Sequence, residues 1–98
     1  MNQTYHLQVT FHTKPGQREM FLRRLVTEGV LDAIRRENGC LRYDFYLSLQ
    51  DENELLLLEE WESRDHQQVH MTQPHMQTMK AIQAETMDSS SLAEIEVR

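Results

Sequence analysis

Apolar and polar residues alternate in three stretches of the chain, and each stretch predicts a β-strand with one buried face. Residues 4–12 place four apolar side chains on one face: Tyr5, Leu7, Val9 and Phe11. Residues 40–49 place five apolar side chains on one face: Leu41, Tyr43, Phe45, Leu47 and Leu49. Residues 92–97 follow a polar "DSSS" loop at 88–91 and present Ala93, Ile95 and Val97. These stretches predict the first, second and last strands of a sheet.

A continuous apolar run, "LLLLEEWE" at 55–62, differs from these alternating stretches. Its short length and the polar "QDENE" turn before it favour a strand buried on both faces rather than a helix. It should pair with the second strand as a hairpin.

A four-residue spacing of apolar positions predicts a helix from Gln17 to about Glu37. Its core-facing stripe contains Phe21, Leu22, Leu25, Val26, Val30, Leu31 and Ile34. Pro15 can begin this helix, and "ENG" at 37–39 can end it. A second, short helix is predicted at 64–71 with Ser63 as its N-cap. Pro74 divides it from a third helix at 75–87, on which His75, Met79 and Ile82 share one face.

The predicted order of strand, helix, strand, strand, helix, strand is the ferredoxin-like βαββαβ pattern of an α+β protein, with its second helical region split at Pro74. Helices cover only one face of such a sheet. We therefore expect a second copy of the sheet to cover the other face.

Length, charge and composition narrow the classes of protein to which this chain can belong. Ninety-eight residues allow one domain, residues 1–98, with a modest core. A net charge of −6 argues against a nucleic-acid partner, and no apolar run reaches the length that a membrane span needs. The first residues lack the pattern of a signal peptide, and the single cysteine, Cys40, cannot form an internal disulfide. We expect a cytoplasmic protein without membrane contact, in which Cys40 packs as a small apolar residue.

Residues 59–76 contain the only tryptophan and three of the five histidines. His66 and His70 lie four apart, so a helix would point both the same way, as two ligands of a zinc ion require. The third protein ligand has no diagnostic spacing, because His75 lies beyond Pro74. We therefore predict no metal site, an exposed His66 and an inward His70. His75 should face the core, either as a structural residue or as an acid or base near neutral pH.

Two quoted segments together resemble the antibiotic biosynthesis monooxygenase (ABM) domain family: "GCLRYDFY" at 39–46 and "ELLLLEEWESRDHQQVHMTQPHMQTM" at 54–79. The resemblance spans essentially the whole chain. The residues that carry it are Gly39, Cys40, Tyr43, Glu60 or Glu59, Trp61, His70, Pro74 and His75.

The resemblance implies a homodimer in which two ferredoxin-like sheets pack into an α+β barrel, with a pocket between sheet and helices in each subunit. It also implies oxidation of a hydroquinone or polycyclic phenol by O2 with no metal, flavin or other cofactor. His70 or His75 would then be the base or hydrogen-bond donor. The expected substrate-contacting residues are Trp61 and Tyr43 as aromatic walls, with Tyr46, Phe45 and Met79.

Three alternatives stay open. One branch of the family degrades haem, but its axial histidine aligns with about Lys80 and its tryptophan with about His70, so haem is not expected. A second branch isomerises a small phosphorylated hydroxydione and shares the turn that is "QPH" here, at 73–75. It would need a cation for the phosphate, from Arg42 or Lys80. The third alternative is a dimeric binding or stress-response module without turnover.

Overall fold

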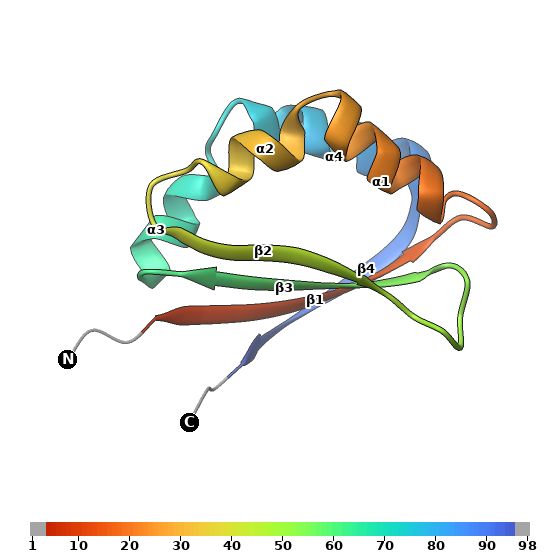
Figure 1. The fold of residues 1–98 in the computed structure, drawn as a ribbon, viewed down its shortest axis with the longest axis horizontal. Helices are drawn as coiled ribbons and strands as arrows, with labels where there is room; N and C mark the ends of the chain where they lie inside the picture. Colours follow the sequence, from red (N-terminus) through yellow and green to blue (C-terminus); the bar gives the residue numbers. More distant parts are fainter. Residues whose placement is uncertain (1–3, 96–98) are drawn as a thin grey trace.

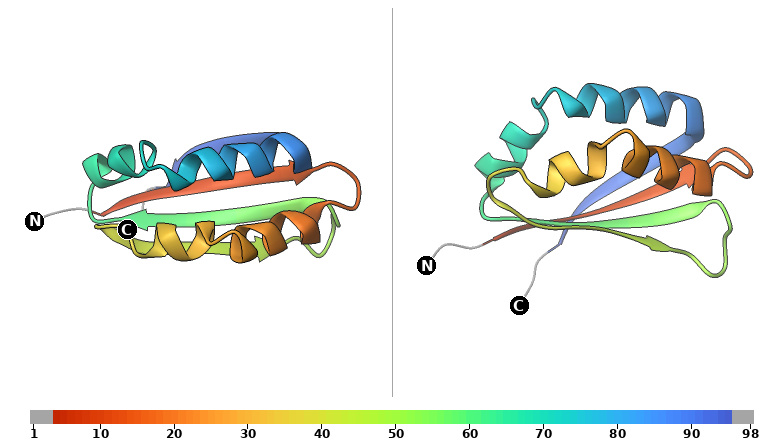
Figure 2. Two further views of the ribbon diagram at one scale, coloured as in Figure 1. Left: turned by 90° about the horizontal axis from the view of Figure 1, so that it is seen from above. Right: turned by 45° about the horizontal axis from the view of Figure 1, so that its top comes forward.

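Four antiparallel strands form one sheet, and the helices pack against one of its faces (Figures 1 and 2). The computed structural model describes residues 4–95. The strands are β1 (Tyr5–Thr13), β2 (Cys40–Leu47), β3 (Glu54–Trp61) and β4 (Met87–Ile95), and their order in the sheet is β2-β3-β1-β4. The helices are α1 (Arg18–Thr27), α2 (Val30–Arg35), α3 (Arg64–His70) and α4 (His75–Thr86). This is the predicted ferredoxin-like α+β fold.

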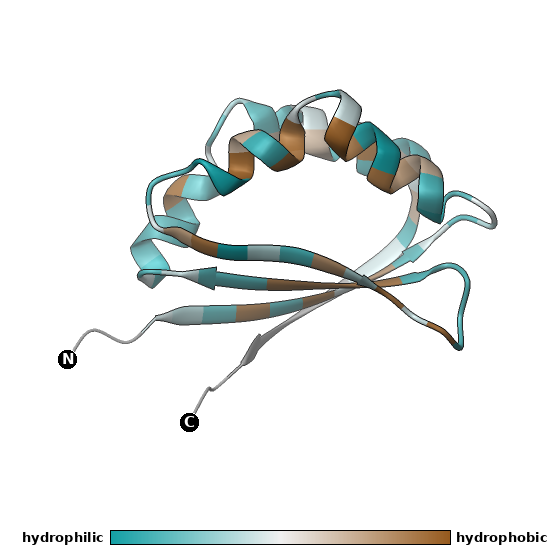
Figure 3. Cartoon of the chain, in the orientation of Figure 1, coloured by the Kyte–Doolittle hydropathy of each residue, from teal (hydrophilic) through white to brown (hydrophobic). Residues whose placement is uncertain are grey.

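The core lies between the sheet and helices α1, α2 and α4. Strand β1 alternates as predicted, with Leu7, Val9 and Phe11 buried. Figure 3 shows hydrophobic positions of α1 and α2 recurring on the sides that face the sheet. Strand β3 was predicted to be buried on both faces, but within one chain Leu56 and Leu58 are only half-buried. They lie on the face of the sheet that the helices do not cover.

The predicted helix 17–37 is wrong in one respect, because the structure divides it into α1 and α2. Gly29 stands between them with a φ of +76°, a left-handed conformation that no continuous α-helix contains. In α1 the buried face carries Phe21 and Leu25, so Val26, predicted to be in the core-facing stripe, is exposed. In α2, Val30 and Ile34 are buried as predicted.

Strand β4 begins earlier than predicted. The "DSSS" segment at 88–91 is not a loop, since Ser89, Ser90 and Ser91 pair with β1. β4 is an edge strand, so polar side chains can point to solvent while their backbone completes the ladder. The predicted facing of Ala93, Ile95 and Val97 lies outside the described side chains.

The ends of β2 also differ from the alternating prediction. Tyr43 is buried and Phe45 half-buried, but Leu41 and Leu47 are about half exposed, and Leu49 lies beyond the strand and is fully exposed. A register irregularity between Cys40 and Arg42 and the position of β2 at the sheet edge account for this. Within residues 4–95, every helix is too short or too polar to cross a membrane.

Gly39, which joins α2 to β2, is the glycine whose substitution should destabilise the fold most. Its φ is +85°, and a Cβ at this position would lie 2.3 Å from Cδ2 of His66. Gly16 has a similar φ of +75° but open space around it. A substitution at Gly16 therefore measures the free-energy cost of the left-handed backbone without a steric clash.

We expect Gly16→Ala to cost about 1 kcal/mol of unfolding free energy from the left-handed conformation alone. Gly39→Ala should cost about 2–4 kcal/mol, because His66 and the loop must also move. Urea unfolding of both variants measures the difference. Equal losses would mean that His66 turns away without cost.

Candidate active site

Three side chains from different elements meet at one carboxylate oxygen. Nδ1 of His70 lies 2.8 Å from Oε2 of Glu37, and Nε2 of His75 lies 2.7 Å from the same atom. An ionised carboxylate only accepts hydrogen bonds, so both nitrogens carry the donated proton. This assignment leaves Nε2 of a neutral His70 and Nδ1 of a neutral His75 as acceptors.

The chain builds this cluster with two helix ends and a turn. Glu37 follows α2, His70 is the last residue of α3, and His75 is the first residue of α4. Ser63 caps α3 as predicted, by accepting a hydrogen bond from the backbone N–H of His66. Pro74 precedes α4 at a position where its missing N–H costs nothing. The two histidines that Pro74 was predicted to separate are thus brought to one carboxylate.

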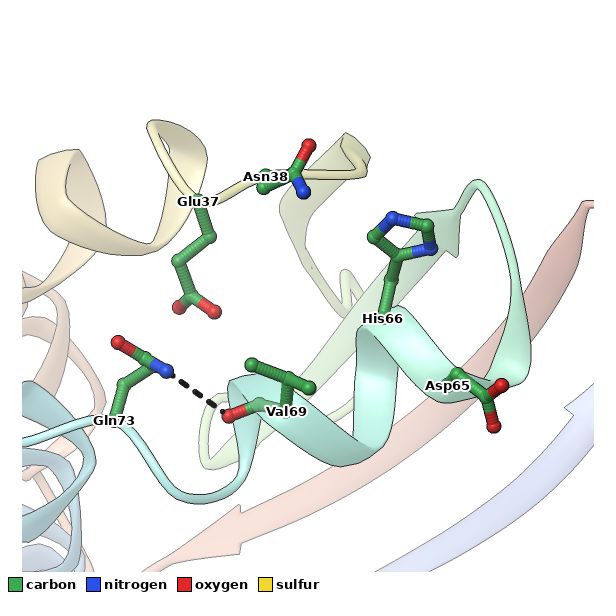
Figure 4. Close-up of a pocket in the computed structure, with 6 residues that line it drawn as sticks. All are labelled: Glu37, Asn38, Asp65, His66, Val69 and Gln73. Carbon is green, nitrogen blue, oxygen red and sulfur yellow. Dashed lines mark hydrogen bonds between the residues drawn. The ribbon is translucent and has the colours of Figure 1, made fainter.

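The cluster is buried on one side and open on the other. The His70 side chain is 2% exposed, that of Glu37 is 9% exposed and that of His75 is 22% exposed. Glu37 also lines a depression of about 340 Å³, together with five other residues: Asn38, Asp65, His66, Val69 and Gln73. In Figure 4 the Glu37 carboxylate points into this space, while Gln73 donates to the backbone carbonyl of Val69. Glu37 therefore connects the opening with the buried histidines.

Aromatic rings enclose the inner side of His70. The centroid of its ring lies 4.6 Å from that of the Trp61 ring, at an interplanar angle of 35°, and 5.7 Å from that of the Tyr43 ring. Trp61 is fully buried, and its Nε1 donates to Oε1 of Glu59 over 3.0 Å. His70 therefore has an apolar, water-poor environment with one ionic partner.

Burial dominates the electrostatics of the neighbouring groups. It raises the pKa of the Glu59 carboxyl above its ordinary 4.5, although the Trp61 hydrogen bond and, when its ring is protonated, the charge of His70 act in the opposite direction. Burial also raises the pKa of the Tyr43 phenol well above 10. The pKa of the Cys40 thiol rises to about 11, chiefly through burial and then through the charges of Glu37 and Glu59. Cys40 is thus a thiol at neutral pH and a poor nucleophile.

Glu59→Gln should stabilise the protein at neutral pH. Because its folded-state pKa is raised, Glu59 binds a proton more tightly when folded than when unfolded, so the wild type loses stability as pH rises above about 4.5. Glutamine keeps an oxygen that can accept from Trp61 and removes the titration. Urea unfolding between pH 4 and 8 should show the variant gaining on the wild type as pH increases. A difference that is constant over this range, or that shrinks, would contradict the raised pKa.

The structure places four of the five predicted substrate-contacting residues in or against one core cluster: Tyr43, Phe45, Trp61 and Met79. Trp61 and Tyr43 lie against His70, and Phe45 packs edge-on against Tyr43. Tyr46 projects to the opposite face of the sheet from Tyr43, where Arg42 donates to its hydroxyl. Within one chain Tyr46 is therefore apart from the histidines.

The structure also shows how the predicted pair of helical histidines, His66 and His70, is arranged. His66 and His70 do not converge, because Nδ1 of His66 lies 2.7 Å from Oγ of Ser63. His66, expected to be exposed, is about one-third exposed. His70 faces inward as expected, and His75 is only partly covered.

Sequence reasoning missed Glu37 and gave Glu59 no role of its own. Glu37 was interpreted only as part of a helix stop, and it lies 33 residues from His70, so no local spacing could connect them. The burial of Glu59 could have been predicted from the two-residue period of a strand, because Glu59 shares the buried face of β3 with Leu55, Leu57 and Trp61. A carboxyl on the buried face of a strand is an unusual position.

The class that this fold and site define is a ferredoxin-like α+β protein with a buried imidazole and carboxylate cluster. The chain matches the family described as antibiotic biosynthesis monooxygenase (ABM) over residues 4–82, and it belongs to that family. It therefore has a monooxygenase-family role. A search of curated proteins finds no match.

Solved structures agree with this fold. The protein PA3566 of Pseudomonas aeruginosa has a TM-score of 0.85 at 20% identity, with 100% of this chain and 98% of that chain covered. A provisionally assigned antibiotic biosynthesis monooxygenase from Nitrosomonas europaea has a TM-score of 0.87 at 20% identity, covering 99% and 92%. Rv0793 of Mycobacterium tuberculosis has a TM-score of 0.81 at 26% identity, covering 98% and 96%.

Proposed function

We propose that this protein oxidises a hydroquinone or polycyclic phenol with O2, without a cofactor, and that the Glu37, His70 and His75 cluster accepts the phenol proton. The observation that carries the proposal is the pair of hydrogen bonds, 2.8 and 2.7 Å long, from the two imidazoles to one Glu37 oxygen. It fixes the tautomer of each ring and leaves each with a free basic nitrogen.

The proton step follows from the charges. With both imidazoles neutral, the cluster carries one negative charge, and it takes up one proton as the phenol becomes a phenolate. Glu37 holds the His70 ring in position, as the carboxylate of a catalytic triad does. The aromatic surroundings of His70 keep water away, so the proton is not simply returned to solvent. His70, the more deeply buried of the two, is our preferred base.

The electron step needs only substrate and O2. A phenolate is a good one-electron donor, and transfer of an electron to triplet O2 removes the spin barrier to reaction. When a phenol has a free C–H opposite the hydroxyl, insertion of one oxygen atom gives a quinone and the second oxygen atom leaves as water. A hydroquinone instead loses two electrons and two protons to give a quinone and hydrogen peroxide.

The site gives less support to the alternative function, isomerisation of a small phosphorylated hydroxydione. Its phosphate would need a cation, but Arg42 lies with Asp44 and Tyr46 on the other face of the sheet, and Lys80 is exposed on α4. The six residues given above for the depression include no lysine or arginine. A non-catalytic binding module remains the outcome if phenols bind without turnover.

We also propose that two chains pair through the uncovered face of the sheet. Leu56 and Leu58 on β3 are half-buried there, and Tyr46, which is paired with Leu56, is exposed on the same face of β2. Apolar side chains on a sheet face favour a second layer. Sedimentation equilibrium should give twice the chain mass at micromolar concentration. A monomer would contradict the pairing.

Oxygen uptake tests the proposed function. Chelator-treated protein is mixed with a panel of hydroquinones, naphthohydroquinones and polycyclic phenols, with heat-denatured protein as the control for autoxidation. We expect uptake above the control for at least one compound. Uptake equal to the control throughout the panel would reject the oxidation, and saturable binding without uptake would favour the binding module.

A further inference from the structure

The Glu37, His70 and His75 cluster has the composition of a metal site as well as of a base. Two imidazole nitrogens with one carboxylate oxygen form a common ligand set for first-row divalent metals, including zinc and iron. We propose that these three side chains form a binding site for a divalent transition-metal ion such as Zn²⁺. This inference rests on the ligand geometry and does not depend on the proposed oxidation.

The three ligand atoms are already close together. They all lie within 4.8 Å of one another, and both nitrogens are hydrogen-bonded to the same Glu37 oxygen. Metal–ligand bonds of about 2.0–2.1 Å place neighbouring ligand atoms about 2.8–3.0 Å apart in octahedral sites and about 3.3–3.4 Å apart in tetrahedral sites. The two nitrogen-to-oxygen separations, 2.8 and 2.7 Å, are close to the first of these ranges. The Glu37 carboxylate must turn aside, so that the ion takes the place of its oxygen in front of both nitrogens.

The surroundings allow an ion to enter and to keep an open position. Glu37 lines the depression of about 340 Å³, and the His75 side chain is 22% exposed. An ion can therefore reach the cluster from that side, and water can complete its coordination. His70 on the buried side is held against Trp61, so one ligand is fixed before the ion arrives.

A second cluster of similar composition is less suitable and provides an internal comparison. His12, Asp51 and Glu54 also lie within 4.8 Å of one another, at the other end of β1. Their side chains are more exposed, at 42% for His12 and 36% for Glu54. Arg18 also donates to the backbone carbonyls of Asp51 and Glu54, which places a fixed positive charge beside that cluster. A cation should prefer the Glu37 cluster.

Metal binding would switch the tautomer of His70. A metal ion on Nδ1 leaves the single proton of a neutral imidazole on Nε2, so that nitrogen can no longer accept a proton. If the proposed oxidation is correct, the metal-loaded protein should be inactive and a chelator should restore its activity. The metal would then be an inhibitor rather than a cofactor.

Cobalt titration of the full chain tests the site without any substrate. Co²⁺ gives visible absorption bands whose intensity reports its coordination number and geometry, so binding to the protein changes the spectrum of the hydrated ion. Chelator-treated protein should bind one Co²⁺ per chain, and Zn²⁺ should displace it. Glu37→Gln and His75→Gln should each weaken binding by about 100-fold or more, because each removes a ligand.

His12→Gln is the matched control, since it changes the same residue type in the competing cluster. It should leave the Co²⁺ affinity unchanged. His75 is partly exposed, so its variant should fold even if Glu37→Gln does not, and circular dichroism checks this. The proposal is overturned if the wild type binds no stoichiometric Co²⁺, if His75→Gln binds as well as the wild type, or if binding is lost in His12→Gln instead.

Discussion

Replacing His70 by glutamine is expected to lower phenol-dependent oxygen uptake by about 10²–10⁴-fold, the usual contribution of a general base. Glutamine is polar and of similar length but has no basic nitrogen, so the variant loses the proton acceptor. The effect should appear mainly in kcat, because the phenol still has the same surfaces to contact.

His12→Gln makes the same change at the far end of β1 and should leave uptake at the wild-type rate. Thermal unfolding of both variants shows whether either fold is weakened. A His70→Gln protein that is folded and retains full uptake would remove His70 from the mechanism. The same result for His75→Gln would then leave the cluster without a catalytic histidine.

Replacing Trp61 by alanine is expected to cost about 3–5 kcal/mol of unfolding free energy, as for other large aromatic residues in cores. Trp61 is fully buried at the end of β3, where it supports the His70 ring and donates to Glu59. Removing it leaves a cavity and also leaves a buried carboxyl without its donor. In a domain of this size that loss is a large part of the total stability.

Trp61→Phe separates the two contributions. It keeps most of the buried area but loses the N–H and part of the indole ring, so its cost should be smaller, about 1–3 kcal/mol. Urea unfolding of the two variants gives the comparison. A loss below about 1 kcal/mol for Trp61→Ala would mean that the end of β3 contributes little to the fold.

The fold could be predicted because its signals are local. Alternation along β1 and β2, the polar turn before β3 and the proline before α4 each act within a few residues. The failures were also local and have physical causes. Gly29 lies inside the single helix predicted over 17–37, whereas its left-handed backbone separates α1 from α2. The serines of β4 looked like a loop because an edge strand tolerates polar side chains.

The site was only half predictable, for a different reason. Trp61, His70 and His75 stand out in one stretch of sequence, but their partner Glu37 comes from the preceding helical segment. Its contact with His70 and His75 depends on how α2, α3 and α4 pack, and tertiary packing leaves no spacing pattern. The same packing brings His70 and His75, which Pro74 separates in the sequence, to one carboxylate.

The central claim, that the Glu37 and His70 cluster ionises a bound phenol, can be tested without oxygen. A polycyclic phenol that is oxidised in the uptake assay is titrated anaerobically with chelator-treated protein, at a pH where the free phenol is neutral. We predict that the phenolate absorption band appears on binding to the wild type and is absent with His70→Gln. A phenol that binds the wild type but stays neutral would contradict the account.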